Sequence, residues 1–355
     1  MHHYTNKPPP HTPATHQLEV VVAAGLEELA RAELRQLGRS AQIVPSAEAG
    51  LLLLRYHGNL RSLLELQLAT SVYMVHTFAV PRPRALLGDQ QLRTIQQLSA
   101  KVIGLHPPGS FRTLYLSAAG GDSTILSRLK GELAAGLGLT VGSDDGDLLV
   151  RLRREPGGGG WQFLVRISPR PLATRAWRVC NREGALNGPV AHAMALLTRP
   201  TPSDRYLNLG CGSGSLLIER LRIGPARSAI GCDRDATALG CAQANLAAAG
   251  LATQCELHNW DVRALPLPAA SIDVVSADLP FGHLVGSHAE NLSLYPALLA
   301  EAARVACPGA RCVVLSHEVR LMERLLAQQS SWQLEQMVRV DLGGLFPRMV
   351  QLRRT

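Results

Sequence analysis

The sequence predicts an α/β protein, in which a mixed α/β N-terminal part precedes a domain built on a doubly wound, mostly parallel sheet. From Tyr206 onward, apolar strand-like runs alternate with helical segments, which is the rhythm of successive βαβ units. Ahead of that region strands and helices also occur, but two strands follow each other as a hairpin. A length of 355 residues favours two domains, because one hydrophobic core rarely serves so long a chain.

The composition is that of a folded, basic protein. Apolar residues make up 46% and charged residues 18% of the chain, which is far from the composition of a disordered protein. The formal net charge of +8 favours an anionic partner, because clustered cations gain from the release of phosphate counterions. A merely soluble basic surface is the alternative. Nucleic acid is therefore the favoured partner.

The chain carries no signal for a membrane or a metal. Apolar runs such as 51–54 have the length of a strand, well short of the roughly 18 residues of a membrane span. The seven cysteines form no Cys-x-x-Cys pair and no secretory segment is visible, so we expect reduced thiols, no zinc site and a cytoplasmic protein, which we take to be a monomer. Residues 1–16, rich in His, Pro and Thr, predict a disordered tail, with metal binding by its histidines as the weaker alternative.

Residues 17–168 form the predicted mixed α/β region. Strands are expected in LEVVVAA, VYMVHTFAV and FRTLYLS. Helices are expected after Gly25, after Asn59, over 89–103 and over 124–137. Ser123 and Gly138 suit the two ends of the last helix. DLLVRLRR and WQFLVRI, joined by four glycines, predict a hairpin; a phosphate-binding loop is disfavoured because no helix begins after the glycines.

Proline-punctuated residues 169–184 are the predicted linker, and residues 185–355 are the predicted second domain. The segment GPVAHAMALL is expected to be helical. Strands are expected in YLNLG, SAIGCD, TQCELHN, SIDVVSADLP and ARCVVLSH, with helices between them. Ligands of such sheets bind outside the carboxyl ends of the strands.

A glycine-rich turn, 210–214, follows the first of these strands and precedes the helix SLLIER. Such a turn lets a ligand approach the backbone closely at a helix N-terminus. The dinucleotide pattern G-x-G-x-x-G fails because position 215 is serine, and a phosphate-loop lysine is absent. Asp233 ends the second strand, where a carboxylate can accept hydrogen bonds from both hydroxyls of a ribose. Asp261, after the third, suits an exocyclic adenine amine.

The fourth strand ends in DLPFG, which predicts a specific chemistry. The lone pair of a nucleobase amine is delocalised into the ring, so methylation is easier when two acceptors turn that lone pair towards the electrophile. The Asp278 carboxylate and the Leu279 carbonyl are suitable acceptors, Pro280 stiffens the turn, and Phe281 can stack on the base. The target base must then be flipped out or unpaired. An ordinary turn after a buried strand is the disfavoured alternative.

Residues 185–355 resemble class I Rossmann-fold methyltransferases that use S-adenosylmethionine, and more narrowly the tRNA guanine-N2 methyltransferases with an N-terminal THUMP domain. The similarity is strongest in DLPFGHLVGSHAENLSLYPALLAEAARV, where DLPFG, the following Val-Gly-Ser and a Leu-Tyr-Pro before a helix look like the family's catalytic segment. REGALN, the terminal DLGGLFPRMVQLRR and, less specifically, GLEELARAELRQLG are also similar.

This resemblance implies a Rossmann-like methyltransferase domain behind a ferredoxin-like module and a THUMP module that holds the 3′ end of tRNA. The implied reaction methylates N2 of a guanosine in the tRNA acceptor stem, at position 6. The implied cofactor-binding residues are Asn208, Gly210, Cys211, Gly212, Gly214, Asp233, Asp261 and Val262. The implied catalytic residues are Asp278, Leu279, Pro280 and Phe281, with Phe281 and His283 contacting the substrate.

Two residues depart from the family's pattern. Asn208 stands where an aspartate is usual, which weakens an expected hydrogen bond to the cofactor's ammonium group, and His283 stands where a lysine is frequent. Other base amines, such as rRNA guanine or adenine or DNA adenine, and a protein glutamine stay open as substrates, although the basic N-terminal region argues against a protein. An RNA-binding protein with a degenerate methyltransferase fold is the alternative of another class, and binding of S-adenosylmethionine distinguishes it.

Overall fold

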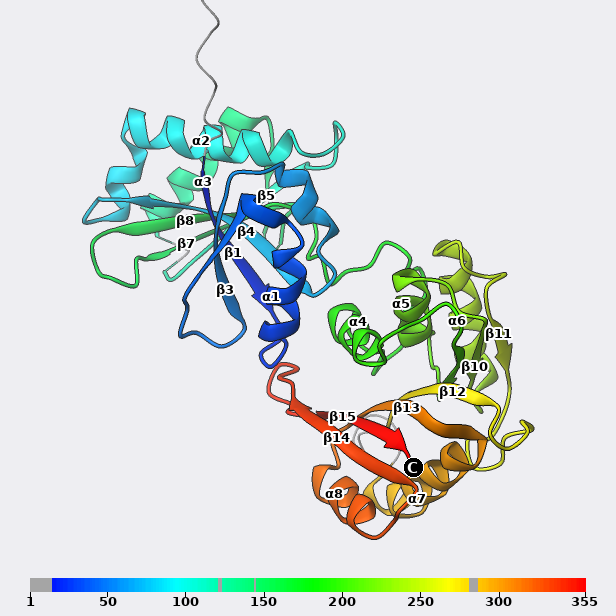
Figure 1. Ribbon diagram of the computed structural model, residues 1–355. Coiled ribbons are helices and arrows are strands. Elements are labelled where there is room, and N and C mark those ends of the chain that lie inside the picture. Colours follow the sequence, from blue (N-terminus) through cyan, green and yellow to red (C-terminus); the bar gives the residue numbers. More distant parts are fainter. Residues whose placement is uncertain (1–14, 121–122, 144, 281–286) are drawn as a thin grey trace, which may run out of the picture. The chain divides into compact units, whose positions relative to one another are not determined.

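The computed structural model describes residues 15–120, 123–143, 145–280 and 287–355. The chain divides into two compact units, each with its own sheet (Figure 1). The first unit contains residues up to 21, 31–66 and 71–170, and the second contains 22–30, 67–70 and 171–355. Among the described helices, none combines the length and the apolarity needed to cross a membrane.

The N-terminal sheet has eight strands in the order β2-β3-β1-β4-β8-β7-β5-β6. The strands are β1 (His16–Val22), β2 (Ala41–Val44), β3 (Leu51–Tyr56), β4 (Ala69–Phe78), β5 (Thr113–Ala118), β6 (Thr140–Val141), β7 (Leu148–Arg154) and β8 (Trp161–Arg166). Strand β5 is parallel to β6 and β7, whereas β7 and β4 are antiparallel to β8. The sheet therefore mixes parallel and antiparallel pairs, and this part combines helices and strands as predicted.

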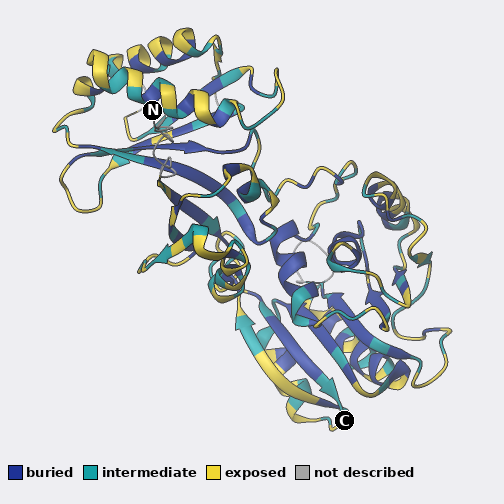
Figure 2. Ribbon diagram, turned by 45° about the horizontal axis from the view of Figure 1, so that its top comes forward, coloured by how far each residue is buried: buried dark blue, intermediate teal, exposed yellow. Residues whose placement is uncertain are grey.

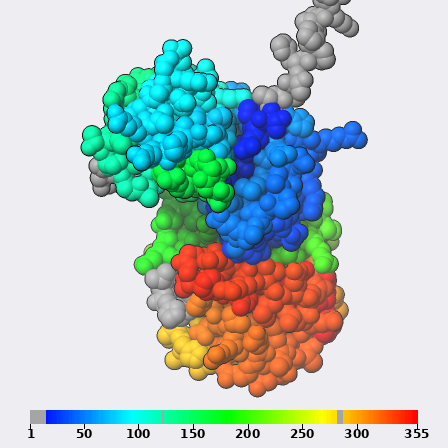
Figure 3. All heavy atoms as spheres, turned by 90° about the vertical axis from the view of Figure 1, so that its left-hand side faces the viewer, coloured from blue at the N-terminus to red at the C-terminus, as the bar shows by residue number. Residues whose placement is uncertain are grey.

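The helices of this part are α1 (Glu27–Arg35), α2 (Asp89–Ile103) and α3 (Thr124–Leu137), with short 3₁₀ helices at Gly38–Ser40, Leu60–Glu65 and Pro83–Leu87. Helix α2 lies on the surface of the first unit (cyan in Figure 3). The predictions for 89–103 and 124–137 are confirmed. Ser123 accepts a hydrogen bond from the backbone N–H of Leu126 at 3.4 Å, and Gly138 ends α3 at φ +66°. Strands β7 and β8 form the predicted antiparallel hairpin.

Two sequence-based expectations about helices are wrong. The segment after Asn59 is a short 3₁₀ helix, although the Asn59 side chain caps it by accepting from the Arg61 N–H. Its apolar residues at three-residue spacing suit a 3₁₀ turn as well as an α-helix. The Leu-Tyr-Pro of the resemblance lies inside helix α7 and not before a helix. Pro296 removes one hydrogen bond there, to the carbonyl of Leu292, which is an exposed residue.

The C-terminal sheet has seven strands in the order β11-β10-β9-β12-β13-β15-β14. The strands are β9 (Arg205–Leu209), β10 (Ser228–Cys232), β11 (Glu256–His258), β12 (Ile272–Asp278), β13 (Ala306–Ser316), β14 (Trp332–Arg339) and β15 (Arg348–Arg354). Strands β9 to β13 pair in parallel, and β15 is antiparallel to both β13 and β14. This is the predicted doubly wound, mostly parallel sheet.

Helices cover both faces of the C-terminal sheet (Figure 1). They are α4 (Gly188–Leu197), α5 (Ser215–Ile223), α6 (Ala236–Ala248), α7 (His288–Val305) and α8 (Val319–Ala327). One buried cluster joins Leu207 and Val275 of the sheet to α7, and a second joins Tyr206 and Val274 to α5. Because neighbouring residues of a strand point to opposite faces, the strands are buried on both sides (Figure 2).

Gly138, the C-cap of α3, and Gly131, inside the helix, make a matched test of that cap. Gly138 adopts φ +66°, and a Cβ added there would meet no atom within 4 Å, so replacing it by alanine adds backbone strain alone. We expect Gly138→Ala to lower the free energy of unfolding by about 1 kcal/mol. Gly131 lies inside the helix, exposed and equally unobstructed. We expect Gly131→Ala to raise it by about 0.5–1 kcal/mol. Denaturant unfolding checks both, and equal effects would contradict the left-handed cap.

Candidate active site

The strand order of the C-terminal sheet brings three predicted segments to one edge. Strand β9 lies between β10 and β12, with Leu209 paired to Cys232 on one side and to Ala277 on the other. Because all three strands are parallel, the glycine turn after β9, Asp233 after β10 and Asp278 at the end of β12 leave the sheet at the same edge. The strand order reverses between β9 and β12, where doubly wound sheets bind their ligands.

The glycine turn has the backbone shape and the open space that a ligand requires. Gly210, Gly212 and Gly214 adopt φ values of +58°, +55° and +82°, a region that side chains disfavour. A Cβ added at Gly210 or Gly212 would meet nothing within 4 Å, whereas one at Gly214 would lie 3.2 Å from the Ala242 side chain. Gly214 thus permits close packing on α6, and the other two glycines leave room for a bound molecule.

Asp233 is held in place by the turn that it faces. One carboxylate oxygen accepts from the Gly212 N–H and the other from the Asp235 N–H, both at 2.9 Å. The carboxylate oxygens keep further acceptor capacity, because each can accept more than one hydrogen bond. A half-buried, fixed carboxylate beside an open glycine turn fits the hydroxyls of a ribose. These residues therefore suit a nucleoside cofactor such as S-adenosylmethionine.

Asp261 and Val262 lie beyond the end of β11. The Asp261 carboxylate binds the Arg263 guanidinium at 2.6 Å and also accepts from the Arg263 N–H. These contacts lower the pKa of Asp261 to about 2. It is a fixed anion, and both of its oxygens already accept from Arg263, so an adenine amine would have to displace part of that ion pair. Val262 is half-buried against the cluster that joins the sheet to α7.

Asn208 and Cys211 are both buried. The Asn208 carboxamide N–H donates to the carbonyl of Ser276 at 3.1 Å and so links β9 to β12, while its Oδ1 is enclosed without a hydrogen-bond partner. An ionised aspartate in this place could not donate that bond. The backbone N–H of Cys211 donates to the Cys232 carbonyl, and burial raises the pKa of the Cys211 thiol.

Asp278 ends β12 with an unpaired acceptor. Its Oδ1 is fully enclosed and has no hydrogen-bond partner, and burial raises the pKa of the carboxyl group to about 7. The next residue is fixed, because the Leu279 N–H donates to the Leu315 carbonyl at 3.0 Å and the Leu279 side chain is buried. An enclosed acceptor without a donor is destabilising by about 1–3 kcal/mol. A ligand with an N–H group would relieve that cost.

The predicted base-stacking residue and the second predicted substrate contact, Phe281 and His283, lie outside the described residues. Pro280, before them, is described. Among the described residues, no group of three or more His, Cys, Asp or Glu side chains has the arrangement of a metal site.

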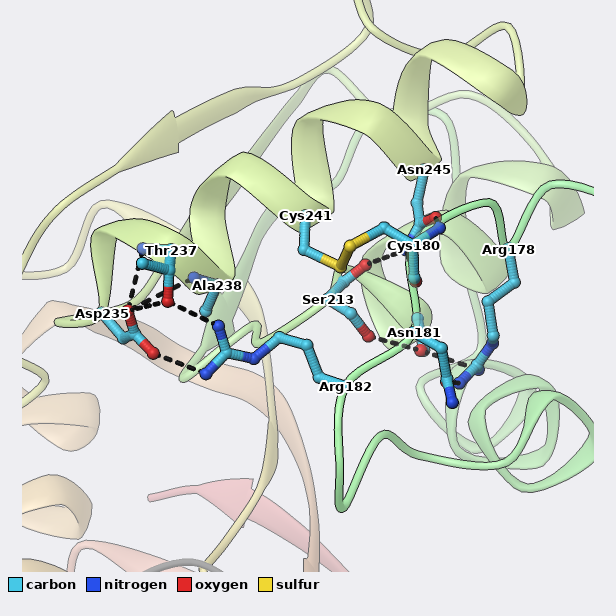
Figure 4. Close-up of a disulfide and its surroundings, with 11 residues drawn as sticks. Arg178, Cys180, Asn181, Arg182, Ser213, Asp235, Thr237, Ala238, Cys241 and Asn245 are labelled. Carbon is cyan, nitrogen blue, oxygen red and sulfur yellow. Dashed lines mark hydrogen bonds and ion pairs between the residues drawn. A yellow bond between two sulfur atoms is a disulfide. The ribbon is translucent and has the colours of Figure 1, made fainter.

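One expectation about the cysteines is wrong. Cys180 and Cys241 form a disulfide, with Cα atoms 5.4 Å apart, whereas the sequence led us to expect reduced thiols throughout (Figure 4). The two residues are 61 positions apart, so no short motif signals the pair, and only the packing of α6 against residues 178–182 brings them together. The other five cysteines are free. The cytoplasmic location rested partly on free thiols and stays a prediction.

Residues 178–182, which we call the clamp segment, are tied to α6 and to the glycine turn by hydrogen bonds as well (Figure 4). The buried Asn245 side chain accepts from the Cys180 N–H at 2.8 Å and donates to the carbonyls of Cys180 and Ser213, both at 2.9 Å. Arg182 binds Asp235 and Thr237 at the start of α6. Asn245 thus fixes the glycine turn, through Ser213, to the clamp segment.

The sequence did not indicate several of the residues that hold this site. Asn245 lies in an alanine-rich helix and signals nothing by spacing. Asn291 and Tyr295, one turn apart on α7, both donate to the carbonyl of Pro280. Their proximity to DLPFG in the sequence was the one available signal, since residues four apart on a helix share a face.

Fold and site together define a Rossmann-like methyltransferase domain of the class that uses S-adenosylmethionine. Residues 175–348, about half of the chain, match the family described as RMKL-like, methyltransferase domain. This stretch of the chain is similar to that methyltransferase family.

Curated relatives that match the chain carry methyltransferase names. The chain is 31% identical over 185 residues to the mouse (Mus musculus) tRNA (guanine(6)-N(2))-methyltransferase THUMP3, covering 48% of this chain and 36% of that protein. It is 37% identical over 112 residues to the bovine (Bos taurus) U6 snRNA (guanine-N(2))-methyltransferase THUMPD2, covering 32% of this chain and 22% of that one. The chain thus spans about a third or less of the length of these relatives.

Among solved structures, TrmN from Thermus thermophilus has a similar fold over 96% of this chain and all of that one, with a TM-score of 0.73 and 24% identity. SMU.472, a putative methyltransferase complexed with SAH, matches over 95% of this chain and 97% of that one, with a TM-score of 0.69 and 15% identity. At these identities the likeness concerns the fold.

The contribution of Asn245 can be tested by truncation. Asn245→Ala leaves the N–H and carbonyl of Cys180 and the carbonyl of Ser213 without their partner, so we expect the free energy of unfolding to fall by about 2–3 kcal/mol. Asn259→Ala is the control, because this exposed amide makes one bond, to the Asp233 carbonyl; we expect a change within about 0.5 kcal/mol. Chemical denaturation measures both. A similar fall in the free energy of unfolding of the two variants would contradict the role of Asn245 in holding the clamp segment.

Proposed function

We propose that this protein transfers a methyl group from S-adenosylmethionine to the N2 amine of a guanosine in RNA. We propose further that the RNA is tRNA and that the target is position 6 of the acceptor stem. The family match and the guanine-N2 activity in the names of the curated relatives support the proposal. The observation that carries it is the enclosed, unpaired carboxylate oxygen of Asp278 next to Leu279.

Asp278 and Leu279 act on the amine of the base. Gly210, Gly212 and Asp233 would hold S-adenosylmethionine, whose sulfonium would supply an electrophilic methyl group; the sulfur–methyl bond would break and its electron pair would stay on the sulfur of S-adenosylhomocysteine. The Asp278 carboxylate and the Leu279 carbonyl accept the two N–H bonds of the amine, which turns the nitrogen lone pair out of the ring plane. The nitrogen forms its new bond with that lone pair, and it must then lose one proton. Asp278 is suited to accept the proton, because its pKa of about 7 lies near neutral pH.

The first unit supports RNA as the substrate. Exposed arginines lie on aromatic rings of its sheet: the Arg151 guanidinium is 4.6 Å from the centre of the Tyr73 ring, and that of Arg154 is 4.9 Å from the Trp161 ring. Such guanidinium groups can bind phosphates and stack on bases. We propose that this unit contains the ferredoxin-like and THUMP modules and holds the 3′ end of tRNA.

Nucleoside analysis tests the proposal directly. The protein is incubated with unmodified tRNA carrying guanosine at position 6 and with S-adenosylmethionine labelled in the methyl group. We expect the label in N2-methylguanosine at position 6. Label in a methylated adenosine, or in U6 snRNA or rRNA with none in tRNA, would replace the proposed substrate, and a protein that binds no S-adenosylmethionine in calorimetry would be the degenerate RNA-binding alternative.

The state of Asp278 predicts the pH dependence of the reaction. The carboxylate form accepts the amine, so we expect kcat/KM to rise as the pH increases through about 7. Because the folded-state pKa lies above its ordinary value, protonation of Asp278 stabilises the fold at low pH, and this contribution is lost as the pH rises through about 7. In Asp278→Asn both dependences should disappear, and the rate should fall by about 100-fold or more.

Asp233→Ala is the control for that variant. It removes a proposed ribose contact, so we expect weaker binding of S-adenosylmethionine by about 10-fold, whereas Asp278→Asn should bind it nearly as the unchanged protein does. Calorimetry measures the affinities. An Asp278→Asn protein of unchanged rate would rule out the acceptor role.

A further inference from the structure

We propose that Asn291 and Tyr295 on α7 are positioning residues, which fix the two acceptors of the base amine by binding the carbonyl of Pro280. This inference rests on the proposed function, because it assigns a role in the same reaction. It concerns residues whose side chains bond Pro280 and not the residues proposed to hold the cofactor or the base amine.

Two side chains of α7 use the acceptor capacity of one carbonyl. The Asn291 carboxamide donates to the Pro280 oxygen at 3.0 Å, and the Tyr295 hydroxyl donates to the same oxygen at 2.8 Å. A carbonyl oxygen has two lone pairs, so both are used, and the direction of the carbonyl is fixed. Both side chains are fully buried, and the Tyr295 hydroxyl also accepts from the Ser316 hydroxyl at 3.3 Å.

These two bonds complete a set of restraints on the backbone of 278–280. The ring of Pro280 fixes its φ, and the bonds from α7 fix its ψ through the carbonyl. Leu279 is restricted because it precedes a proline, and its N–H is bound to the Leu315 carbonyl. The Leu279 carbonyl, which is the second proposed acceptor, therefore has little freedom to turn. Without the bonds from α7, the Pro280 carbonyl could turn between the ψ regions that sterics allow.

The stability of helix α7 does not explain why position 291 is an asparagine. Asparagine has a low helix propensity, and here its Oδ1 is buried without a hydrogen-bond partner. Exchanging its oxygen and nitrogen would set two acceptors against each other, so the orientation of the amide is determined. A leucine of similar size would suit the helix and its buried surroundings better. The residue is explained by the bond that it donates to Pro280.

The test measures rate, cofactor affinity and stability in Asn291→Leu, Tyr295→Phe and the double variant, with labelled S-adenosylmethionine and unmodified tRNA. We expect kcat to fall about 5-fold in each single variant and about 100-fold in the double variant, because one donor alone still holds the carbonyl in part. The Kd for S-adenosylmethionine should stay within about twofold. Asn291→Leu should unfold at an unchanged or higher temperature, whereas a residue that served stability alone would lower it.

Tyr206→Phe is the matched control. Tyr206 is equally buried and its hydroxyl bonds a serine, Ser276, as that of Tyr295 bonds Ser316, but Tyr206 does not contact Pro280. We expect its kcat to stay within about twofold of the unchanged protein. Equal kcat losses in Tyr206→Phe and Tyr295→Phe, or an unchanged kcat in the double variant, would overturn the proposal.

The design separates this proposal from the proposed function. If the unchanged protein methylates no RNA, the proposed function fails, and the anchoring is then judged by hydrogen exchange of the Leu279 amide. Faster exchange in the double variant than in Tyr206→Phe supports the anchoring of Leu279 by α7. Equal exchange contradicts it.

Discussion

The parallel pairing of β9 with β12 is the constraint on which the site depends. The chain that leaves β9 continues into α5, which packs on one face of the sheet, and the chain that leaves β12 leads to α7, which packs on the other. Neither helix can then cover the edge between the two strands. The Asn208 side chain adds a bond to the Ser276 carbonyl, which ties the two strands together just below that edge. The glycine turn and Asp278 therefore emerge side by side.

On both sides of this sheet edge, a buried asparagine of a neighbouring helix binds the backbone of the segment that leaves the strand. On the cofactor side, Asn245 of α6 binds the carbonyl of Ser213 and the backbone of Cys180, so that its oxygen and both of its N–H groups are paired. On the other side, Asn291 of α7 binds the carbonyl of Pro280. An amide side chain suits this task because it can donate to a carbonyl without bringing a charge into the core. The backbone on both sides of the site is thus fixed by buried amides of α6 and α7.

The sequence was sufficient where a local pattern decides the structure. Helix α3 was predicted to the residue because its spacing, Ser123 and Gly138 all lie within one segment, and the glycine turn was visible from its composition and from the strand before it. Contacts between distant segments were not visible. The Cys180–Cys241 disulfide joins residues that only the packing of α6 brings together, and the donors to Pro280 are recognisable only once α7 is placed. Sequence chemistry thus identified the sheet edge at which the predicted site residues meet, whereas the residues that hold this edge in place required the structure.

The enclosed oxygens of Asn208, Asp278 and Asn291 have a common physical meaning. Each is an acceptor without a donor, and each such group is destabilising by about 1–3 kcal/mol. In Asn208 and in Asn291, the N–H group of the side chain donates to a backbone carbonyl. The cost of the unpaired oxygen is therefore offset by a hydrogen bond that orders the site. Asp278 has no such compensation, and its carboxyl group binds a proton more tightly than usual because of burial. A base amine is the donor that would complete it. The unpaired oxygen of Asp278 destabilises the free protein, and an amine that donates to it would remove this cost. The same free energy would then favour binding of the amine.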